Sequence, residues 1–158
     1  KDSRIFPDAN STLRVTYGKV KGYAPKDATL YTSTTYLDGI MEKYIPGDYE
    51  FNVPSKLIDL YKTKNYGPYA ENGKMPVCFI ATNHTTGGNS GSPAIDAKGN
   101  LIGLNFDRVW EGTMSDIYYD PNICRNIMVD ARYILFIIDK YADAKNIISE
   151  LKLVHPKK

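Results

Sequence analysis

Several short segments of the chain either alternate apolar with polar side chains or contain clusters of β-branched and aromatic residues. These patterns are typical of half-buried and fully buried strands. The segments are residues 12 to 23, 77 to 82, 94 to 96, 101 to 106, 117 to 119 and 123 to 129. An Ala-Lys-Gly-Asn turn between the third and fourth segments predicts a hairpin, and Gly18 is a candidate bulge in the first. The pattern therefore predicts a mainly β chain.

Elsewhere the apolar spacing changes to three and four, which predicts amphipathic helices. Short helices are expected at residues 33 to 44 and 55 to 64, and a C-terminal helical segment at about residues 130 to 152. Asp130 is the expected N-cap of this last segment, because its side chain can accept a hydrogen bond from the first turn. A break between two helices is expected near residues 142 to 143.

Composition limits the class of protein. The 158 residues are 42% hydrophobic, so we expect residues 1 to 158 to form a single domain with its own core. The 20 basic and 18 acidic side chains are dispersed and leave a net charge of +2, so no basic stripe suited to nucleic acid is present. The apolar run at residues 133 to 138 is too short for a membrane span. The first residues lack an apolar signal core, so any secretion signal has been removed or belongs to a longer precursor.

Cysteine and histidine are few and scattered. Cys78, Cys124, His84 and His155 occur at no ligand spacing typical of a metal site, so we expect no metal and no cofactor. Both cysteines lie in apolar, strand-like segments, which favours buried free thiols. A single disulfide stays open, because the sequence does not give the distance between the two residues.

The strongest chemical signal is Ser90, in the run Thr-Thr-Gly-Gly-Asn-Ser-Gly-Ser-Pro at residues 85 to 93. A serine hydroxyl is an effective nucleophile only when it is exposed, has a base beside it and has backbone N–H groups aimed at the developing oxyanion. The glycines of this run allow the backbone angles and the close substrate approach that such a site requires. The alternative is an ordinary surface turn, since Gly, Ser and Asn dominate turns. Predicted strands flank the loop on both sides, which favours a nucleophile.

These residues, together with residues 99 to 112 and 129 to 140, closely resemble the bacterial dipeptidyl-peptidase 7 and 11 family of chymotrypsin-like serine peptidases, and the resemblance covers most of residues 5 to 153. It implies an antiparallel, trypsin-like β-barrel, the nucleophile-bearing half of a double barrel, with short inserted helices and one or two C-terminal helices. It also implies a periplasmic, cell-surface or secreted serine exopeptidase that releases N-terminal dipeptides from peptides with a free N-terminus by acyl-enzyme hydrolysis.

The resemblance assigns roles to individual residues. Ser90 would be the nucleophile, and the backbone N–H groups of Gly88 and Ser90 would form the oxyanion hole. Asn89 replaces the aspartate of trypsin-like enzymes, so activation by an ion pair with a new N-terminus is not expected. Arg108 marks the branch with a pocket for Asp or Glu as the second substrate residue, because a guanidinium binds a carboxylate bidentately. Asp107 would help to hold the substrate's α-ammonium group.

The residues around Arg108 also have other interpretations. Taken alone, an arginine at a strand end is more often solvated or paired with a structural carboxylate. Phe106 and Trp110 are candidates for the pocket wall, although an aromatic residue beside a strand more often belongs to the core.

A general base is the missing part of the predicted site. His84 lies only six residues before Ser90 (90 minus 84) and His155 lies in a polar tail, whereas in two-barrel peptidases the base comes from the other barrel. We therefore expect a C-terminal fragment, inactive or nearly so alone, whose N-terminal barrel and helical domain lie upstream in the same polypeptide. The face toward these parts should be apolar, which would favour a homodimer of the fragment. A glutamyl-endopeptidase-like protease and a non-catalytic, peptide-binding pseudopeptidase are the alternative functions.

Overall fold

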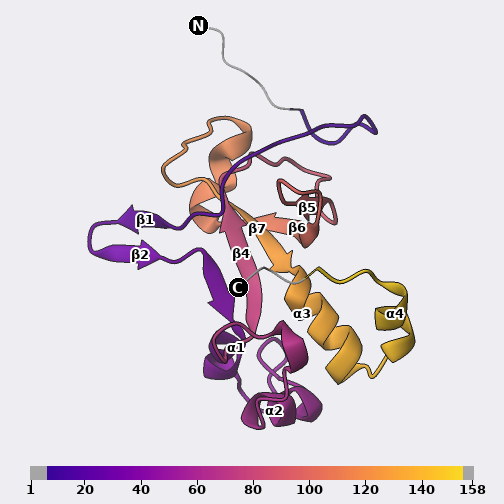
Figure 1. The fold of residues 1–158 in the computed structure, drawn as a ribbon. Coiled ribbons are helices and arrows are strands. Elements are labelled where there is room, and N and C mark those ends of the chain that lie inside the picture. Colours follow the sequence, from indigo (N-terminus) through magenta and orange to yellow (C-terminus); the bar gives the residue numbers. More distant parts are fainter. Residues whose placement is uncertain (1–6, 155–158) are drawn as a thin grey trace, which may run out of the picture.

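A five-stranded antiparallel sheet lies at the centre of the computed structural model, which describes residues 7–154 (Figure 1). Its strand order is β3-β4-β7-β6-β5, and a separate hairpin of β1 and β2 lies beside it. The strands are β1 (Tyr23–Lys26), β2 (Thr29–Tyr31), β3 (Thr34–Tyr36), β4 (Pro76–Ala81), β5 (Pro93–Ile95), β6 (Leu101–Arg108) and β7 (Asn126–Asp130). The predicted antiparallel sheet is confirmed. Within residues 7–154 no ladder joins β5 to β3, so these strands form an open sheet and not the closed barrel that was expected.

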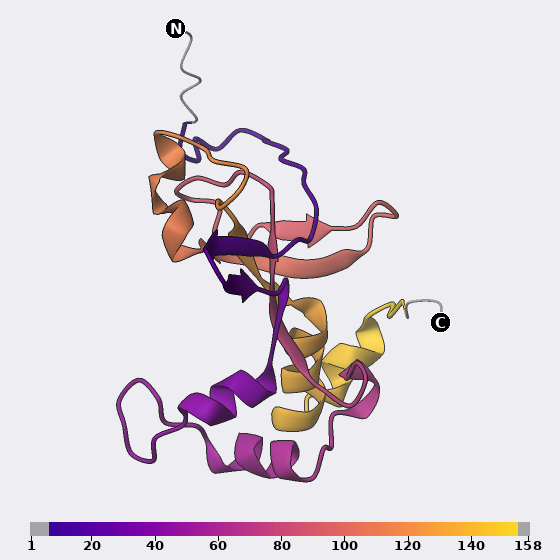
Figure 2. The same cartoon turned by 90° about the vertical axis from the view of Figure 1, so that its left-hand side faces the viewer.

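Most of the helices gather at one end of the sheet, with η2 at the opposite end (Figure 2). They are α1 (Leu37–Lys43), α2 (Ser55–Lys62), the 3₁₀ helices η1 (Gly67–Tyr69) and η2 (Trp110–Asp116), α3 (Ala131–Phe136), the π-helical turn η3 (Ile137–Tyr141) and α4 (Lys145–Glu150). Leu37, Met75 and Phe136 are fully buried and form the centre of the core between these helices and β4. The fold is therefore mixed, with a helical layer that holds the end of the sheet.

The sheet has one face with a small core of its own. Phe79 and Ala81 of β4 and Met128 of β7 are buried there, with Ala94 and Ile102 packed against them. Because side chains alternate along a strand, Ile80 of β4 points to the opposite face. That face borders a groove of about 640 Å³ beside the β1-β2 hairpin.

Most predicted elements are confirmed. The predicted helices correspond to α1, α2 and the run from α3 to α4, and the predicted hairpin corresponds to β5 and β6. Asp130 caps α3 as expected, because its side chain accepts a hydrogen bond from the Arg132 N–H. The break falls where expected, since Asp143 has a left-handed backbone with a φ of 54°.

The strand predicted at residues 12 to 23 is wrong over most of its length. Only an isolated bridge between Val20 and Ala81 connects this segment to the sheet, and regular pairing begins at Tyr23. Leu13 and Tyr17 are 95% and 91% exposed, so their alternation does not reflect burial in this part of the chain. A period of two creates a regular strand only when another strand lies alongside over its length, and here the pairing with the end of β4 does not extend beyond the single bridge.

The strand predicted at residues 117 to 119 is also wrong. The backbone N–H groups of Ile117 and Tyr118 both donate to the Met114 carbonyl oxygen, which continues the turn of η2. The strand predicted at 123 to 129 is confirmed from Asn126 onward as β7. Local hydrogen bonding has therefore overridden the β-propensity of Ile117 and its neighbours.

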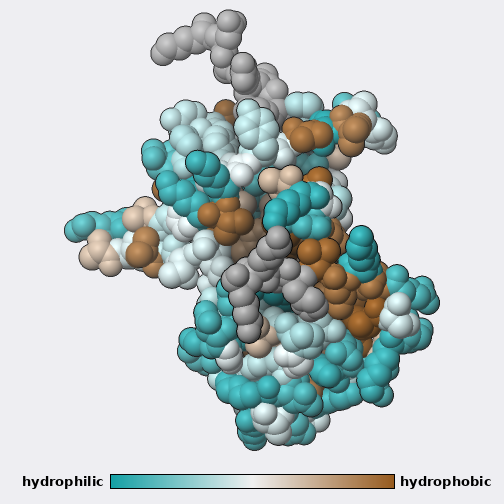
Figure 3. Space-filling model, viewed as in Figure 1, coloured by the Kyte–Doolittle hydropathy of each residue, from teal (hydrophilic) through white to brown (hydrophobic). Residues whose placement is uncertain are grey.

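The surface shows hydrophobic side chains gathered along the flank of α3 and toward α4 (Figure 3). Ile147 and Leu151 in this region are roughly half exposed. None of the helices within residues 7–154 is long and apolar enough to cross a bilayer.

Candidate active site

Ser90 lies at an exposed bend between two glycines in left-handed conformation. Gly88 and Gly91 both have a φ of 84°, a region that other residues rarely adopt. The Ser90 side chain is exposed, and its Oγ donates to the carbonyl oxygen of Phe106 in β6 at 3.3 Å. The serine is thus held at the surface beside the strand that carries Arg108, as a nucleophile would need to be.

Asparagine side chains hold this loop in place. Asn89 Oδ1 accepts from the Thr86 N–H at 2.8 Å, and the Asn89 N–H donates back to the Thr86 carbonyl oxygen. Asn105 of β6 accepts from the Gly91 N–H, and its own amide group donates to the Asn89 carbonyl oxygen. Asn89 therefore orders the loop through neutral hydrogen bonds, where trypsin-like enzymes have a buried ion pair.

The N–H groups predicted to form the oxyanion hole donate to no group of the described residues. Among the hydrogen bonds of residues 7–154, the Asn89 and Gly91 N–H groups donate inward, whereas none has Gly88 or Ser90 N–H as donor. An oxyanion hole needs donors of this kind, here the N–H of the exposed serine itself and that of the residue two positions before it. The geometry of the loop is compatible with the roles predicted for Gly88 and Ser90.

An early segment of the chain crosses this loop. The Asp8 carboxylate accepts from the Gly87 N–H at 3.1 Å, and the Ala9 N–H donates to the Gly87 carbonyl oxygen at 2.8 Å. A Cβ built on Gly88 would lie only 2.5 Å from the Ala9 Cβ, so the close approach itself requires glycine at position 88. Residues 7–9 thus fix the peptide that immediately precedes the predicted oxyanion hole.

Arg108, at the end of β6, binds two residues of η2. Its Nη1 donates to the Ser115 Oγ and to the Asp116 Oδ1, each at 2.8 Å, and its Nη2 donates to the Asp116 Oδ2 at 3.1 Å. In this structure Arg108 is therefore paired with a carboxylate of its own chain, as one of the alternative interpretations expected. The Arg108 side chain is only 22% exposed, and its guanidinium holds the carboxylate in the two-pronged geometry that an acidic substrate side chain would adopt.

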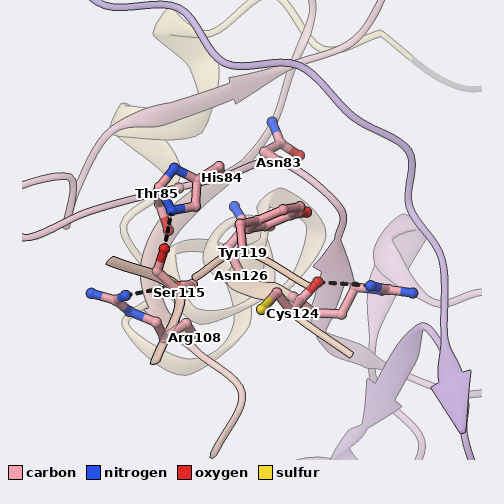
Figure 4. Close-up of a pocket in the computed structure, with 9 residues that line it drawn as sticks. Asn83, His84, Thr85, Arg108, Ser115, Tyr119, Cys124 and Asn126 are labelled. Carbon is pink, nitrogen blue, oxygen red and sulfur yellow. Dashed lines mark hydrogen bonds between the residues drawn. The ribbon is translucent and has the colours of Figure 1, made fainter. Parts of the chain in front are cut away.

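A narrow cavity of about 10 Å³, enough for about one water molecule, lies beside this arginine. Figure 4 shows Arg108 reaching the Ser115 hydroxyl while His84 reaches the Ser115 backbone oxygen, with Tyr119 beside the imidazole ring. His84 Nε2 lies 2.9 Å from that oxygen, and the imidazole packs edge-on against Tyr119. The geometry identifies His84 as part of the cavity wall, and His155 lies outside the described residues.

The cavity is connected to the serine loop through buried amides. Asn126 of β7 lines the cavity, is 1% exposed and donates to Asn105 Oδ1 at 3.1 Å. Asn105 in turn binds the Asn89 carbonyl oxygen, one residue before the serine. The specificity pocket implied by Arg108 and the loop of Ser90 are thus parts of one hydrogen-bonded unit.

The Asp107 carboxylate is not bound to the guanidinium of the neighbouring Arg108. Its Oδ1 accepts from the Arg108 backbone N–H at 2.8 Å, whereas the guanidinium of that residue is bound to Asp116. The Asp107 side chain is exposed, so its carboxylate is accessible to a cationic group from outside. Phe106 and Trp110 are 46% and 86% exposed, so neither belongs to the core.

Both cysteines are free thiols in the structure, Cys124 buried and Cys78 half-buried. Burial raises the pKa of the Cys78 thiol above its ordinary value. No group of three or more His, Cys, Asp and Glu side chains in the described part of the chain could hold a metal ion.

Sequence reasoning missed three residues of this site: Asp8, Ser115 and Asp116. Asp8 is 79 residues from the glycine that it binds, and no local pattern connects the two. Ser115 and Asp116 lie in a segment for which the sequence predicted no element, because η2 has no apolar periodicity of its own. The one available signal was an acidic residue within ten positions of an arginine predicted to bind carboxylates.

Comparison with known proteins places this site in a family. A model of the family described as Peptidase S46 matches residues 1–153. The Asp/Glu-specific dipeptidyl-peptidase of Flavobacterium psychrophilum is 80% identical over 157 residues, which are 99% of this chain and 22% of that protein. The crystal structure of Porphyromonas endodontalis DPP11 in complex with the dipeptide Arg-Asp superposes with a TM-score of 0.85 at 54% identity, and its complex with Arg-Glu with a TM-score of 0.84 at 55% identity.

The matched regions cover 87% and 85% of this chain but only 20% of each of those structures. The chain thus spans about a fifth of the length of its relatives. The family match includes all of the residues that build the serine loop, β6 and the cavity beside Arg108. The chain therefore belongs to the peptidase S46 family.

Proposed function

We propose that this chain is the nucleophile-bearing part of a serine exopeptidase that releases N-terminal dipeptides with Asp or Glu as the second residue. The observation that carries the proposal is the Arg108 guanidinium, which already holds a carboxylate two-pronged beside the loop of Ser90. The relatives named Asp/Glu-specific dipeptidyl-peptidase and the structures titled as complexes with Arg-Asp and Arg-Glu support it.

The proposed chemistry follows from the groups in the site. Ser90 Oγ gives its proton to the base and attacks the carbonyl carbon of the second substrate residue, and the Gly88 and Ser90 N–H groups receive the developing oxyanion. Collapse of the tetrahedral intermediate breaks the peptide bond and expels the remaining peptide as an amine, which takes the proton from the base. Water then hydrolyses the acyl-enzyme and restores the Ser90 hydroxyl. Asp107 holds the α-ammonium of the first residue, so the distance between the two charged anchors selects dipeptides.

The remainder of the full-length protein supplies the parts that this chain does not show. The base and its orienting carboxylate come from the upstream barrel, as in other two-barrel serine peptidases. The open sheet then forms the nucleophile-bearing half of a trypsin-like double barrel. The groove of about 640 Å³ is the surface that the rest of the polypeptide covers, since its walls carry exposed Leu30, Tyr31 and Trp110. Such an enzyme would act in the periplasm, at the cell surface or outside the cell.

The test uses the full-length protein and fluorogenic dipeptides that end in Asp, Glu or Asn. Ser90→Ala should lower kcat by at least about 10³-fold. Arg108→Met should lower kcat/KM by about 10²-fold for the acidic substrates and have little effect with the Asn substrate. Asp107→Asn should raise KM for substrates with a free N-terminus.

The alternatives give different results in the same assay. Cleavage of N-blocked peptides as fast as free ones would support a glutamyl endopeptidase. Binding of acidic peptides without turnover would support a pseudopeptidase. An acidic preference that survives Arg108→Met would contradict the proposed function.

A further inference from the structure

The acidic partner of Arg108 occupies the place that the proposed function gives to the substrate. Two guanidinium nitrogens are bound to the two oxygens of Asp116, at 2.8 and 3.1 Å. A carboxylate of the substrate's second residue that binds the same end of the guanidinium would use the same two-pronged geometry. Both carboxylates cannot hold these two N–H groups at once, since each hydrogen is already directed at an oxygen of Asp116.

The two η2 residues that bind Arg108 differ in their surroundings. Ser115 is 4% exposed, and its backbone oxygen also bonds with His84, so it is held from two sides. Asp116 is the last residue of η2, and its side chain is 44% exposed. The next two residues, Ile117 and Tyr118, are 89% and 66% exposed, so the side chains that directly follow Asp116 pack little against the protein. Ser115 is therefore the fixed partner of the guanidinium, and Asp116 is the exchangeable one.

An ion pair of this kind is weak enough to be displaced. Ion pairs with one partner nearly half exposed contribute little to stability, because water solvates the released carboxylate well. Displacement leaves the Asp116 carboxylate in solvent and does not bury an unpaired charge. The Arg108 guanidinium exchanges one carboxylate for another and retains its bond to Ser115.

We infer that Asp116 is an internal competitor for the specificity pocket: it occupies the Arg108 fork in the empty enzyme and is displaced by the acidic side chain of the substrate. This inference rests on the proposed function. It makes Asp116 a specificity-determining residue that sets how strongly the enzyme binds acidic substrates. Only the fraction of the enzyme in which Asp116 has released Arg108 can bind the acidic side chain, and the apparent affinity is lowered by that fraction. Removal of the Asp116 carboxylate should therefore tighten substrate binding.

The experiment compares Asp116→Asn with the unmodified full-length enzyme on dipeptide substrates ending in Asp and in Asn. Asp116→Asn should lower KM for the Asp substrate about 5-fold with kcat unchanged, and leave KM for the Asn substrate unaltered. Asp143→Asn is the matched control: it removes the same charge from an exposed carboxylate paired only with Lys145, and should change neither KM. Asp116→Ala serves as a second variant if the first loses its fold, as judged by activity on the Asn substrate.

A double-mutant cycle separates competition from long-range repulsion. In an Arg108→Met background, the effect of Asp116→Asn on the Asp substrate should vanish, because the two carboxylates no longer compete for a fork. A persistent effect, or an equal effect of Asp143→Asn, would show simple charge repulsion and overturn the inference. An unchanged or higher KM in Asp116→Asn would also overturn it. If Arg108→Met nonetheless abolishes the acidic preference, the proposed function stands and only this inference fails.

Discussion

Asp130 is the residue whose loss should most clearly destabilise the part of the fold that carries the site. It ends β7 and begins α3, and its side chain is 6% exposed. One oxygen accepts from the Arg132 backbone N–H at 2.8 Å and from Arg132 Nε at 2.9 Å, and the other accepts from Arg132 Nη2 at 2.7 Å. This hydrogen bonding raises the pKa of Arg132 further above its ordinary value. A single carboxylate is thus both a helix cap and half of an ion pair.

The magnitude of the effect follows from these two roles. Loss of the N-cap should cost about 1 kcal/mol. The ion pair adds about 1 to 2 kcal/mol, because the carboxylate is buried but the Arg132 side chain is 36% exposed and partly solvated. Asp130→Ala should therefore lower the free energy of unfolding by about 2 to 3 kcal/mol. Asp130→Asn keeps an acceptor for the cap and loses the charge, so it should cost about 1 to 2 kcal/mol.

Chemical denaturation of the 158-residue chain in guanidinium chloride measures these values. Lys145→Ala is the matched control, since its ion pair with Asp143 is 73% and 70% exposed on the two side chains. It should change the free energy of unfolding by no more than about 0.5 kcal/mol. If Asp130→Ala costs no more than the control, with equal m-values, the argument that burial makes this pair stabilising is wrong.

Two further predictions concern the serine loop and the β5-β6 hairpin. In the full-length enzyme, Asp8→Ala should lower kcat about 3- to 10-fold with little change in KM, because the Gly87 peptide beside the proposed oxyanion hole loses its acceptor. Asp8→Asn keeps an acceptor oxygen and should restore most of the rate, and equal losses in both variants would show that the contact does not position the loop. Asp96 accepts hydrogen bonds from the side chain and backbone of Asn100, which hold the pKa of its carboxyl below the ordinary value. Its contribution to stability is therefore complete above the ordinary pKa of Asp and is lost as pH falls through the lowered value. Acid titration of Asp96→Asn should show a shallower loss of stability below about pH 4 than the parent chain, and identical curves would refute this role.

The resemblance carried by short motifs predicted where the chemistry would lie. Ser90, Gly88, Arg108 and Asp107 are brought into one region, since β6 both anchors the serine loop and carries the two charged residues. The sequence does not decide whether the Arg108 guanidinium is solvated, is paired with a carboxylate of its own chain or binds the substrate. The structure shows the internal partner to be Asp116, and its proposed displacement is what reconciles this pair with a role in substrate binding.

Features that depend on near neighbours could be predicted from the sequence alone. The Thr86–Asn89 turn before Ser90, the Asp96 turn and the cap at Asp130 are local, because each of these hydrogen bonds joins residues a few positions apart. Apolar periodicity also predicted α1, α2 and the run from α3 to α4, because the spacing of apolar residues along a helix does not depend on what its apolar face packs against.

Contacts between groups far apart in the sequence depend on how the whole chain packs. The contact of Asp8 with Gly87 and the failure of residues 12 to 19 to form a strand both depend on what lies alongside in space. Alternation of side chains specifies two faces but not a neighbouring strand, and a charged side chain specifies a type of partner but not its identity. Distances between segments far apart in the chain are set by the packing of the whole fold, so the partner of each such group emerges only there.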